Sequence, residues 1–171
     1  MSGPSRGGKS RWAESLLLTH QRVTYVATAA QRPDDGDWQR RLDRHRQRRP
    51  KHWQLIESGA DLSGSLAMVE PSHSVLIDAL GGFVAWHLDQ SDQDWQRQVE
   101  GLIKQLTVMP QTRVLVAEET GWGVVPATKI GGQFRDRLGE LSQQLQQHAD
   151  QSWLVIQGRA LDLQALGHPV P

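Results

Sequence analysis

The start of the chain carries the feature that most constrains its fold. Residues 3–10, GPSRGGKS, match the phosphate-binding loop pattern G-x-x-x-x-G-K-[ST] at every constrained position. Backbone N–H groups of such a loop turn toward a polyphosphate, Lys9 can reach its terminal phosphates, and the Ser10 hydroxyl can ligate Mg²⁺ at the first turn of a helix. The pattern predicts a nucleotide site in an α/β fold. Its nucleotide-binding residues are Gly3, Pro4, Ser5, Arg6, Gly7, Gly8, Lys9 and Ser10.

A strand normally leads into this loop, yet only Met1 and Ser2 precede it. We therefore expect the first strand to be missing, with an empty slot in the middle of the sheet and a loop anchored on one side only. Such a chain should be less stable, and should bind nucleotide more weakly, than the same chain with a first strand restored.

Hydrophobic periodicity predicts strands alternating with helices along the rest of the chain. This alternation is typical of an open, mostly parallel sheet with helices on both faces, a P-loop NTPase architecture. The carboxyl ends of such strands, where ligands bind, meet at one edge. The tail from Gln157 is predicted as loop. Predicted strands span 23–28, 52–57, 74–78, 114–117 and 153–156, and predicted helices span 10–19, 37–48, 61–68, 79–87, 92–108 and 134–149.

Size and composition narrow the class of protein. The 171 residues suit a single nucleotide-binding catalytic domain, 1–171. Lys plus Arg equal Asp plus Glu at 19 each, so no global basic field favours nucleic acid as a partner. The absence of cysteine excludes disulfides, thiolate metal sites and a cysteine nucleophile, and it agrees with a cytoplasmic location. No apolar run is long enough to predict a membrane span.

Acidic residues end two of the predicted strands. Asp78 closes the apolar run 74–77, where the acid that orders the Mg²⁺ shell stands in phosphate-loop enzymes. Glu118 and Glu119 follow the run 114–117 and lead into a glycine-rich loop. We take Ser10 and Asp78 as metal ligands, and Asp78 and Glu119 as part of the nucleotide site.

The predicted helix 37–48 and its continuation carry an unusual concentration of positive charge around His45. Helical spacing places Arg41, His45 and Arg48 on one face. A solvated basic helix, a nucleic-acid contact and a polyphosphate clamp with His45 as nucleophile or acid/base all fit this pattern. The basic residues are Arg40, Arg41, Arg44, Arg46, Arg48, Arg49 and Lys51.

These segments together resemble one enzyme family. The phosphate loop is followed in order by RLDRHRQRRPKHW at 41–53, ETGWGVVP at 119–126 and FRD at 134–136. The combination resembles the bifunctional adenosylcobinamide kinase/adenosylcobinamide-phosphate guanylyltransferases of cobalamin biosynthesis over nearly the whole chain. Ala127 and Ser142 depart from the residues that relatives carry there.

The resemblance implies a recombinase-like sheet, a homo-oligomer, a trimer in the best-known form, and two reactions. The enzyme would phosphorylate adenosylcobinamide with ATP or GTP and Mg²⁺, then transfer GMP from GTP to adenosylcobinamide phosphate, releasing pyrophosphate. The family's guanylylated histidine falls on His45, and Lys9 serves the kinase step. Arg41, Arg48 and Arg49 would neutralise phosphate charge and disfavour protonation of the nucleophile.

Three other interpretations fit the sequence. A kinase-only homologue would keep Lys9 but would not guanylylate. A recombinase-like ATP-dependent nucleic-acid binder would use the basic segment on phosphates. A nucleotide-binding remnant without activity is the third.

Overall fold

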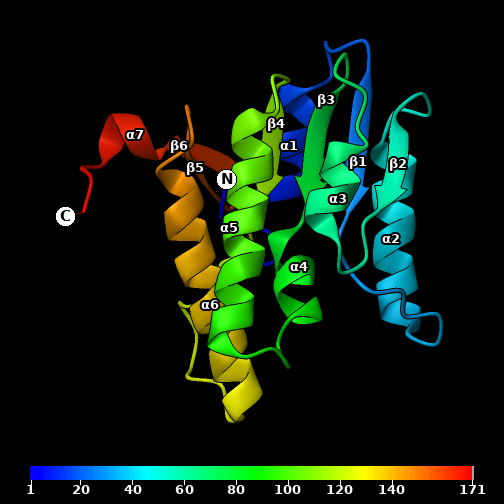
Figure 1. The fold of residues 1–171 in the computed structure, drawn as a ribbon. Coiled ribbons are helices and arrows are strands. Elements are labelled where there is room, and N and C mark those ends of the chain that lie inside the picture. Colours follow the sequence, from blue (N-terminus) through cyan, green and yellow to red (C-terminus); the bar gives the residue numbers. More distant parts are fainter. Residues whose placement is uncertain (171) are drawn as a thin grey trace.

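The computed structural model describes residues 1–170, except for the side chain of Arg41 (Figure 1). It alternates strands and helices much as the sequence predicts. Side-chain caps begin several helices: Asp35 accepts from Trp38 N, Ser91 from Asp94 N, and Thr128 from Gly131 N. The elements are α1 (Lys9–Leu16), β1 (Val23–Ala27), α2 (Gly36–Arg48), β2 (Gln54–Glu57), α3 (Leu62–Ala67), β3 (Ser74–Asp78), α4 (Leu80–Trp86), α5 (Asp92–Val108), β4 (Arg113–Val116), α6 (Lys129–Gln146), β5 (Trp153–Ile156), β6 (Arg159–Asp162) and α7 (Leu163–Leu166).

The main sheet has the strand order β2-β1-β3-β4, and every neighbouring pair is parallel. Ala27 pairs with Asp78, and Asp78 pairs with Val116, so the carboxyl ends of these strands lie at one edge. The predicted α/β class with a mostly parallel sheet is confirmed. Asp78 and the residues that follow Val116 therefore meet at the edge where open α/β sheets bind ligands.

Helices cover both faces of the sheet and bury two apolar clusters (Figure 1). One cluster packs α3, α4, α5 and α6 on Val26, Val75 and Ile77. The other packs Ala13 of α1 and Leu17, which caps the end of this helix, on alternating residues of the same strands. Tyr25 and Leu76 face α1. Because side chains alternate along a strand, Ala27 and Asp78, two positions further along, face α1 as well.

Residues Met1–Gly3 lie between β4 and β5, in the slot that we expected to be empty. The Met1 amino group donates to Leu115 O at 2.8 Å, and Ala117 N donates to Met1 O at 2.9 Å. On the other side Ser2 forms a parallel bridge with Leu154. Although no full first strand forms, the expectation of a loop anchored on one side only is wrong, because this short segment uses the backbone groups of both neighbours.

The tail from Gln157 is not a loop, so that expectation is wrong as well. β5 and β6 form an antiparallel hairpin, and α7 follows. Gln157 and Gly158 make the turn with φ of 51° and 75°, the left-handed values that a two-residue hairpin requires. The pair Gln157-Gly158 between two short runs was the sequence signal that could have predicted this turn. α6 also begins earlier than predicted, because Thr128 caps it.

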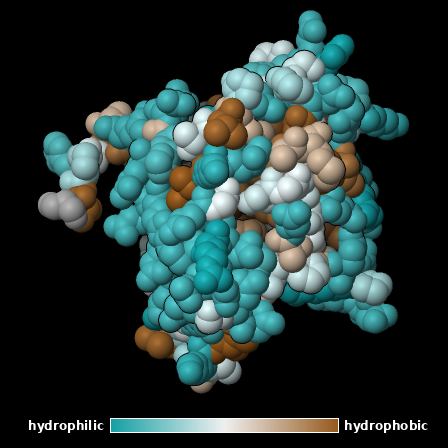
Figure 2. All heavy atoms as spheres, viewed as in Figure 1, coloured by the Kyte–Doolittle hydropathy of each residue, from teal (hydrophilic) through white to brown (hydrophobic). Residues whose placement is uncertain are grey.

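The visible face of the molecule is mainly hydrophilic, with exposed apolar side chains gathered near the lower end of α6 (Figure 2). In the part of the chain that the structure describes, no helix is long and apolar enough to cross a bilayer.

Candidate functional site

The phosphate loop leads directly into α1, as its pattern requires. Gly8 is the N-cap residue of this helix and has left-handed φ of 110°. The buried Lys9 folds back over the loop, and its Nζ donates to Pro4 O at 2.8 Å. Gly7 N donates to the same carbonyl at 3.1 Å. The loop is therefore closed on itself, with the lysine amine held across it.

Two glycines of the loop are required by its close contact with β5. A Cβ built on Gly3 would lie 2.1 Å from Val155 O, and one built on Gly7 would lie 2.6 Å from the same atom. In both cases the contacted atom is a backbone oxygen of a paired strand, which cannot rotate away as a side chain could. The phosphate-loop pattern constrains Gly3 and leaves the residue at Gly7 open, whereas the structure requires glycine at both positions for the loop to pack against the hairpin.

Asp78 ends β3 on the face that α1 covers. It shares this face with Tyr25, whose hydroxyl donates to Asp78 Oδ2 at 2.9 Å. The Asp78 side chain is only 8% exposed. Burial and the adjacent carboxylate raise the pKa of Tyr25 far above its usual value, so this hydroxyl stays a donor. Asp78 is thus a buried carboxylate with a fixed hydrogen-bond donor on one oxygen.

The two glutamates after β4 have different surroundings. Glu118 lies two residues after Val116 and accepts from Gly81 N at 2.9 Å. Burial is the main cause that raises the pKa of Glu118, and the hydrogen bond from Gly81 N opposes it; among nearby charges, Asp78 raises this pKa and Lys9 lowers it. Glu119 instead accepts from Gly121 N at 2.6 Å within its own loop, and its backbone N donates to Gly3 O. Glu118 is therefore the glutamate whose pKa responds to the charges of both Asp78 and Lys9.

The basic helix α2 contacts the same face through its last turn. His45 Nδ1 lies 3.7 Å from Asp78 Oδ2 and 3.4 Å from the guanidinium Nη2 of Arg48. Arg48 pairs with Glu14 of α1 through two hydrogen bonds of 3.1 and 3.0 Å, which raise the pKa of the Arg48 guanidinium. Three elements that are distant in sequence, α1, α2 and the end of β3, therefore meet around His45.

The remaining candidates divide between this cluster and its surroundings. The Arg49 guanidinium lies over the Tyr25 ring at 4.6 Å, a cation–π contact. Ser5 and Arg6 are exposed at the tip of the loop, and Ser10 is half-buried. Arg41 belongs to α2, but its side chain lies outside the described part of the chain. The roles assigned to all of these residues stay predictions.

Three residues of the cluster were not predicted as site residues. Tyr25 could have been found, because strand alternation places it on the same face as Asp78 when the two strands pair. Glu118 was noted, but Glu119 was chosen in its place. Glu14 carried no sequence signal, because its pairing with Arg48 depends on how α2 packs against α1.

A magnesium ion fits these residues as a companion of the nucleotide. Mg²⁺ in phosphate-transfer sites uses one or two carboxylates, a loop hydroxyl and phosphate oxygens. Among the described residues no group of three or more His, Cys, Asp or Glu side chains could hold a metal alone. Asp78 and the Ser10 hydroxyl are donors of the kind that a nucleotide-bound ion uses, and their assignment as its ligands stays a prediction.

Comparison with known proteins agrees with this constellation. A family model described as cobinamide kinase / cobinamide phosphate guanyltransferase matches residues 1–163. The chain belongs to this family. The resemblance inferred from the sequence motifs is confirmed, and the chain is accordingly classed as a transferase of the cobinamide kinase / cobinamide phosphate guanyltransferase family.

Two relatives show how far the similarity extends. The bifunctional adenosylcobalamin biosynthesis protein CobU of Escherichia coli K12 is 32% identical, over 92% of this chain and 94% of its own length. The bifunctional adenosylcobalamin biosynthesis protein CobP of Pseudomonas aeruginosa PAO1 is 33% identical, over 98% of this chain and 96% of its own length. The family similarity thus includes the phosphate loop, the basic helix and both acidic strand ends.

Proposed function

We propose that this chain catalyses two successive reactions on one corrinoid. It first transfers a phosphoryl group from ATP or GTP to the hydroxyl of adenosylcobinamide. It then transfers GMP from GTP to adenosylcobinamide phosphate through a covalent intermediate on His45, giving adenosylcobinamide-GDP and pyrophosphate. The observation that carries the proposal is the position of His45 beside Asp78, at the strand-end edge and on the face that also carries the phosphate loop.

His45 suits the role of nucleophile because of what surrounds it. A nucleophilic histidine must be neutral, and its ring must be oriented so that one nitrogen keeps a free lone pair. The positive charge of Arg48 disfavours a second positive charge on the ring, while the pairing of Arg48 with Glu14 keeps the guanidinium in position. Arg49 adds a further positive charge beside Tyr25.

The two neighbours of Nδ1 favour different tautomers. Arg48 is a donor only, so contact with it favours a lone pair on Nδ1. Asp78 is an acceptor, so approach to it favours a proton on Nδ1 and a lone pair on Nε2. We assign the reactive form to the second tautomer, in which Asp78 holds the Nδ1 proton and Tyr25 holds Asp78 in place.

Bonds and protons balance in the guanylyl transfer. Nε2 of His45 bonds to the α-phosphorus of GTP while the bond from that phosphorus to the bridging oxygen breaks, so pyrophosphate leaves with the electron pair. A phosphate oxygen of adenosylcobinamide phosphate then attacks the same phosphorus, and the N–P bond breaks. Nδ1 keeps its proton toward Asp78 throughout, so His45 returns to its starting tautomer.

The kinase step uses the residues around the loop. Lys9 and the loop N–H groups would hold the transferred phosphoryl group, and Mg²⁺ bound with the nucleotide would offset its charge. Glu118 has a raised pKa and lies under the influence of Lys9, which suits it to accept the proton of the substrate hydroxyl. We expect the enzyme to act as a homo-oligomer, without nucleic acid.

Radiolabel transfer tests the covalent step. Wild-type protein incubated with α-labelled GTP and Mg²⁺ should retain label after denaturation, and His45→Ala should retain none. His52→Ala is the matched control, because His52 lies outside the cluster around Asp78 and should leave labelling unchanged. Undiminished labelling of His45→Ala would remove His45 as nucleophile.

Product analysis separates the two reactions. Adenosylcobinamide with ATP should yield its phosphate in wild type and in His45→Ala, and Lys9→Ala should lose this product. Formation of the phosphate without any labelling of wild-type protein by GTP would identify a kinase-only enzyme. Absence of both activities would overturn the proposal.

A further inference from the structure

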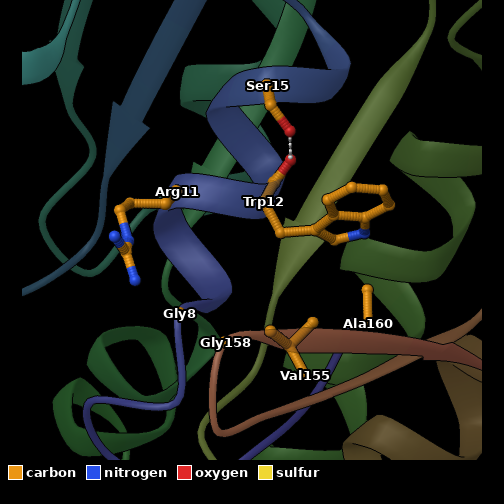
Figure 3. Close-up of a pocket in the computed structure, with 7 residues that line it drawn as sticks. All are labelled: Gly8, Arg11, Trp12, Ser15, Val155, Gly158 and Ala160. Carbon is orange, nitrogen blue, oxygen red and sulfur yellow. Dashed lines mark hydrogen bonds between the residues drawn. The ribbon is translucent and has the colours of Figure 1, made fainter.

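A pocket lies directly beside the phosphate loop, between α1 and the β5–β6 hairpin (Figure 3). Its volume is about 270 Å³. The hairpin turn is tied to the loop, because Gly158 N donates to Gly7 O at 2.9 Å. The lining residues are Gly8, Arg11, Trp12, Ser15, Val155, Gly158 and Ala160.

One side of this pocket is apolar and aromatic. In Figure 3 the indole of Trp12 extends from α1 across the space above Val155 and Ala160. Trp153 packs edge-on against Trp12, with ring centroids 5.4 Å apart, and so supports the indole. An indole face over small aliphatic side chains is a surface on which a planar ring can stack.

The opposite side of the pocket is polar and adjoins the phosphate site. Figure 3 shows Arg11 leaving α1 on the side away from Trp12. Its Nη2 atom lies 3.9 Å from the position that a Cβ on Gly8 would take, so the guanidinium reaches back to the end of the loop. A ligand with an aromatic end and an anionic end could therefore contact Trp12 with the first and Arg11 with the second.

The lining also contains an unused hydrogen-bond donor. Trp12 Nε1 is buried and has no hydrogen-bond partner among the described residues. In Figure 3 this nitrogen lies on the edge of the indole nearest Ala160. Because this nitrogen is inaccessible to solvent, it indicates that the edge of the indole is tightly packed, so that the ring is held in place over the pocket.

Size separates the two substrates of the proposed reactions. The pocket volume of about 270 Å³ lies just below the range for ligand sites, roughly 300–1,000 Å³. It can hold a nucleoside, whereas a corrin macrocycle with its amide side chains is far larger. The pocket also begins at Gly8, the last residue before Lys9, where a chain of phosphates bound to the loop would emerge.

We propose that this pocket binds the nucleoside of the nucleotide whose phosphates occupy residues 3–10, with the base stacked on Trp12 and Arg11 at the junction with the phosphates. This inference rests on the proposed function, since it requires a nucleotide at the loop. It assigns to the hairpin of β5 and β6 a binding role in addition to its structural one.

The test compares GTP with inorganic tripolyphosphate, which has the phosphates but no nucleoside. Both are titrated calorimetrically into wild type, Trp12→Ala and Ala160→Leu. Loss of base stacking should weaken GTP binding by about tenfold in Trp12→Ala. Ala160→Leu should have a similar effect by filling the pocket. Neither variant should change tripolyphosphate affinity, whereas Lys9→Ala should weaken both ligands.

Controls keep the outcomes distinct. Leu18→Ala, an exposed position just beyond α1 and outside the pocket lining, should leave both affinities unchanged. If Trp12→Ala does not fold, Ala160→Leu decides by itself. If GTP and tripolyphosphate compete in wild type but the ratio of their affinities is the same in the folded variants, the inference is wrong and the nucleotide site stands. If GTP does not bind, or tripolyphosphate does not displace it, the proposed function and the inference both fail.

Discussion

The Arg48–Glu14 pair joins the histidine-bearing helix α2 to α1, and it offers the sharpest test of the site geometry. We predict that Arg48→Ala and Glu14→Ala each lower the free energy of unfolding, and that the two losses are strongly non-additive. The reason is that Glu14 is buried, with a side chain only 8% exposed, while Arg48 is 35% exposed. Removal of the arginine would leave a buried carboxylate unpaired.

The expected magnitude follows from the two hydrogen bonds. A hydrogen bond to a charged group is worth about 1.5–3 kcal/mol when well formed. Exposure of the arginine screens the charge, so we reduce the total for the pair to about 1.5–3 kcal/mol rather than doubling it. In a chain of this size each kcal/mol shifts Tm by about 2–4 °C. A double-mutant cycle by urea denaturation at low salt measures the coupling directly.

A second ion pair in the same chain provides the matched control. Arg97 and Asp94 approach to 2.7 Å, but their side chains are 63% and 50% exposed, so their coupling should be only about 0.2–0.5 kcal/mol. Equal coupling in both pairs would refute the burial argument. Glu14→Gln further separates stability from binding. It should lower stability and weaken nucleotide affinity less than Arg48→Ala does, because it loosens the guanidinium without removing it.

Two further predictions concern the loop and its edge. Because burial raises the folded-state pKa of Glu118, its ionisation destabilises the fold increasingly as pH rises above the ordinary value of 4.5. Glu118→Gln should therefore be more stable than wild type at pH 7, and the difference should vanish at or below pH 4.5. The same variant should be slower in the kinase step. Equal stability of the two proteins at every pH would contradict the burial of Glu118. Gly3→Ala should disrupt the pairing of Ser2 with β5 and lower stability by roughly 1–3 kcal/mol, the worth of two backbone hydrogen bonds, while Gly132→Ala, where a Cβ meets nothing within 4 Å, should not. Denaturation midpoints measure both effects, and unchanged stability of Gly3→Ala would show that the loop can move away from Val155.

The hairpin at the end of the chain shows where prediction from sequence failed. Leu161 and the neighbouring residues of β6 form a strand too short and too polar to give a periodic signal. Its formation depends on pairing with β5 and on the bond from Gly158 N to Gly7 O. The short segment Met1–Gly3 is a similar case, since it takes an extended path because two strands offer it hydrogen bonds. The turn at Gln157-Gly158 is the one local signal for the hairpin, whereas nothing in the local sequence predicts the extended path of Met1–Gly3.

Features that depend on contiguous residues, by contrast, could be predicted from the sequence. The sequence by itself determined the phosphate loop, the parallel α/β class and the placement of Asp78 at a strand end, because periodicity and motif spacing are properties of contiguous residues. Only the tertiary structure decided that Glu118, and not Glu119, accepts from Gly81 N, that Arg48 pairs with Glu14, and that Tyr25 donates to the carboxylate beside His45. Arg48 and Glu14 are 34 residues apart and Tyr25 and Asp78 are 53 apart, so the packing of helices on the sheet, and not the sequence pattern, brings their atoms together.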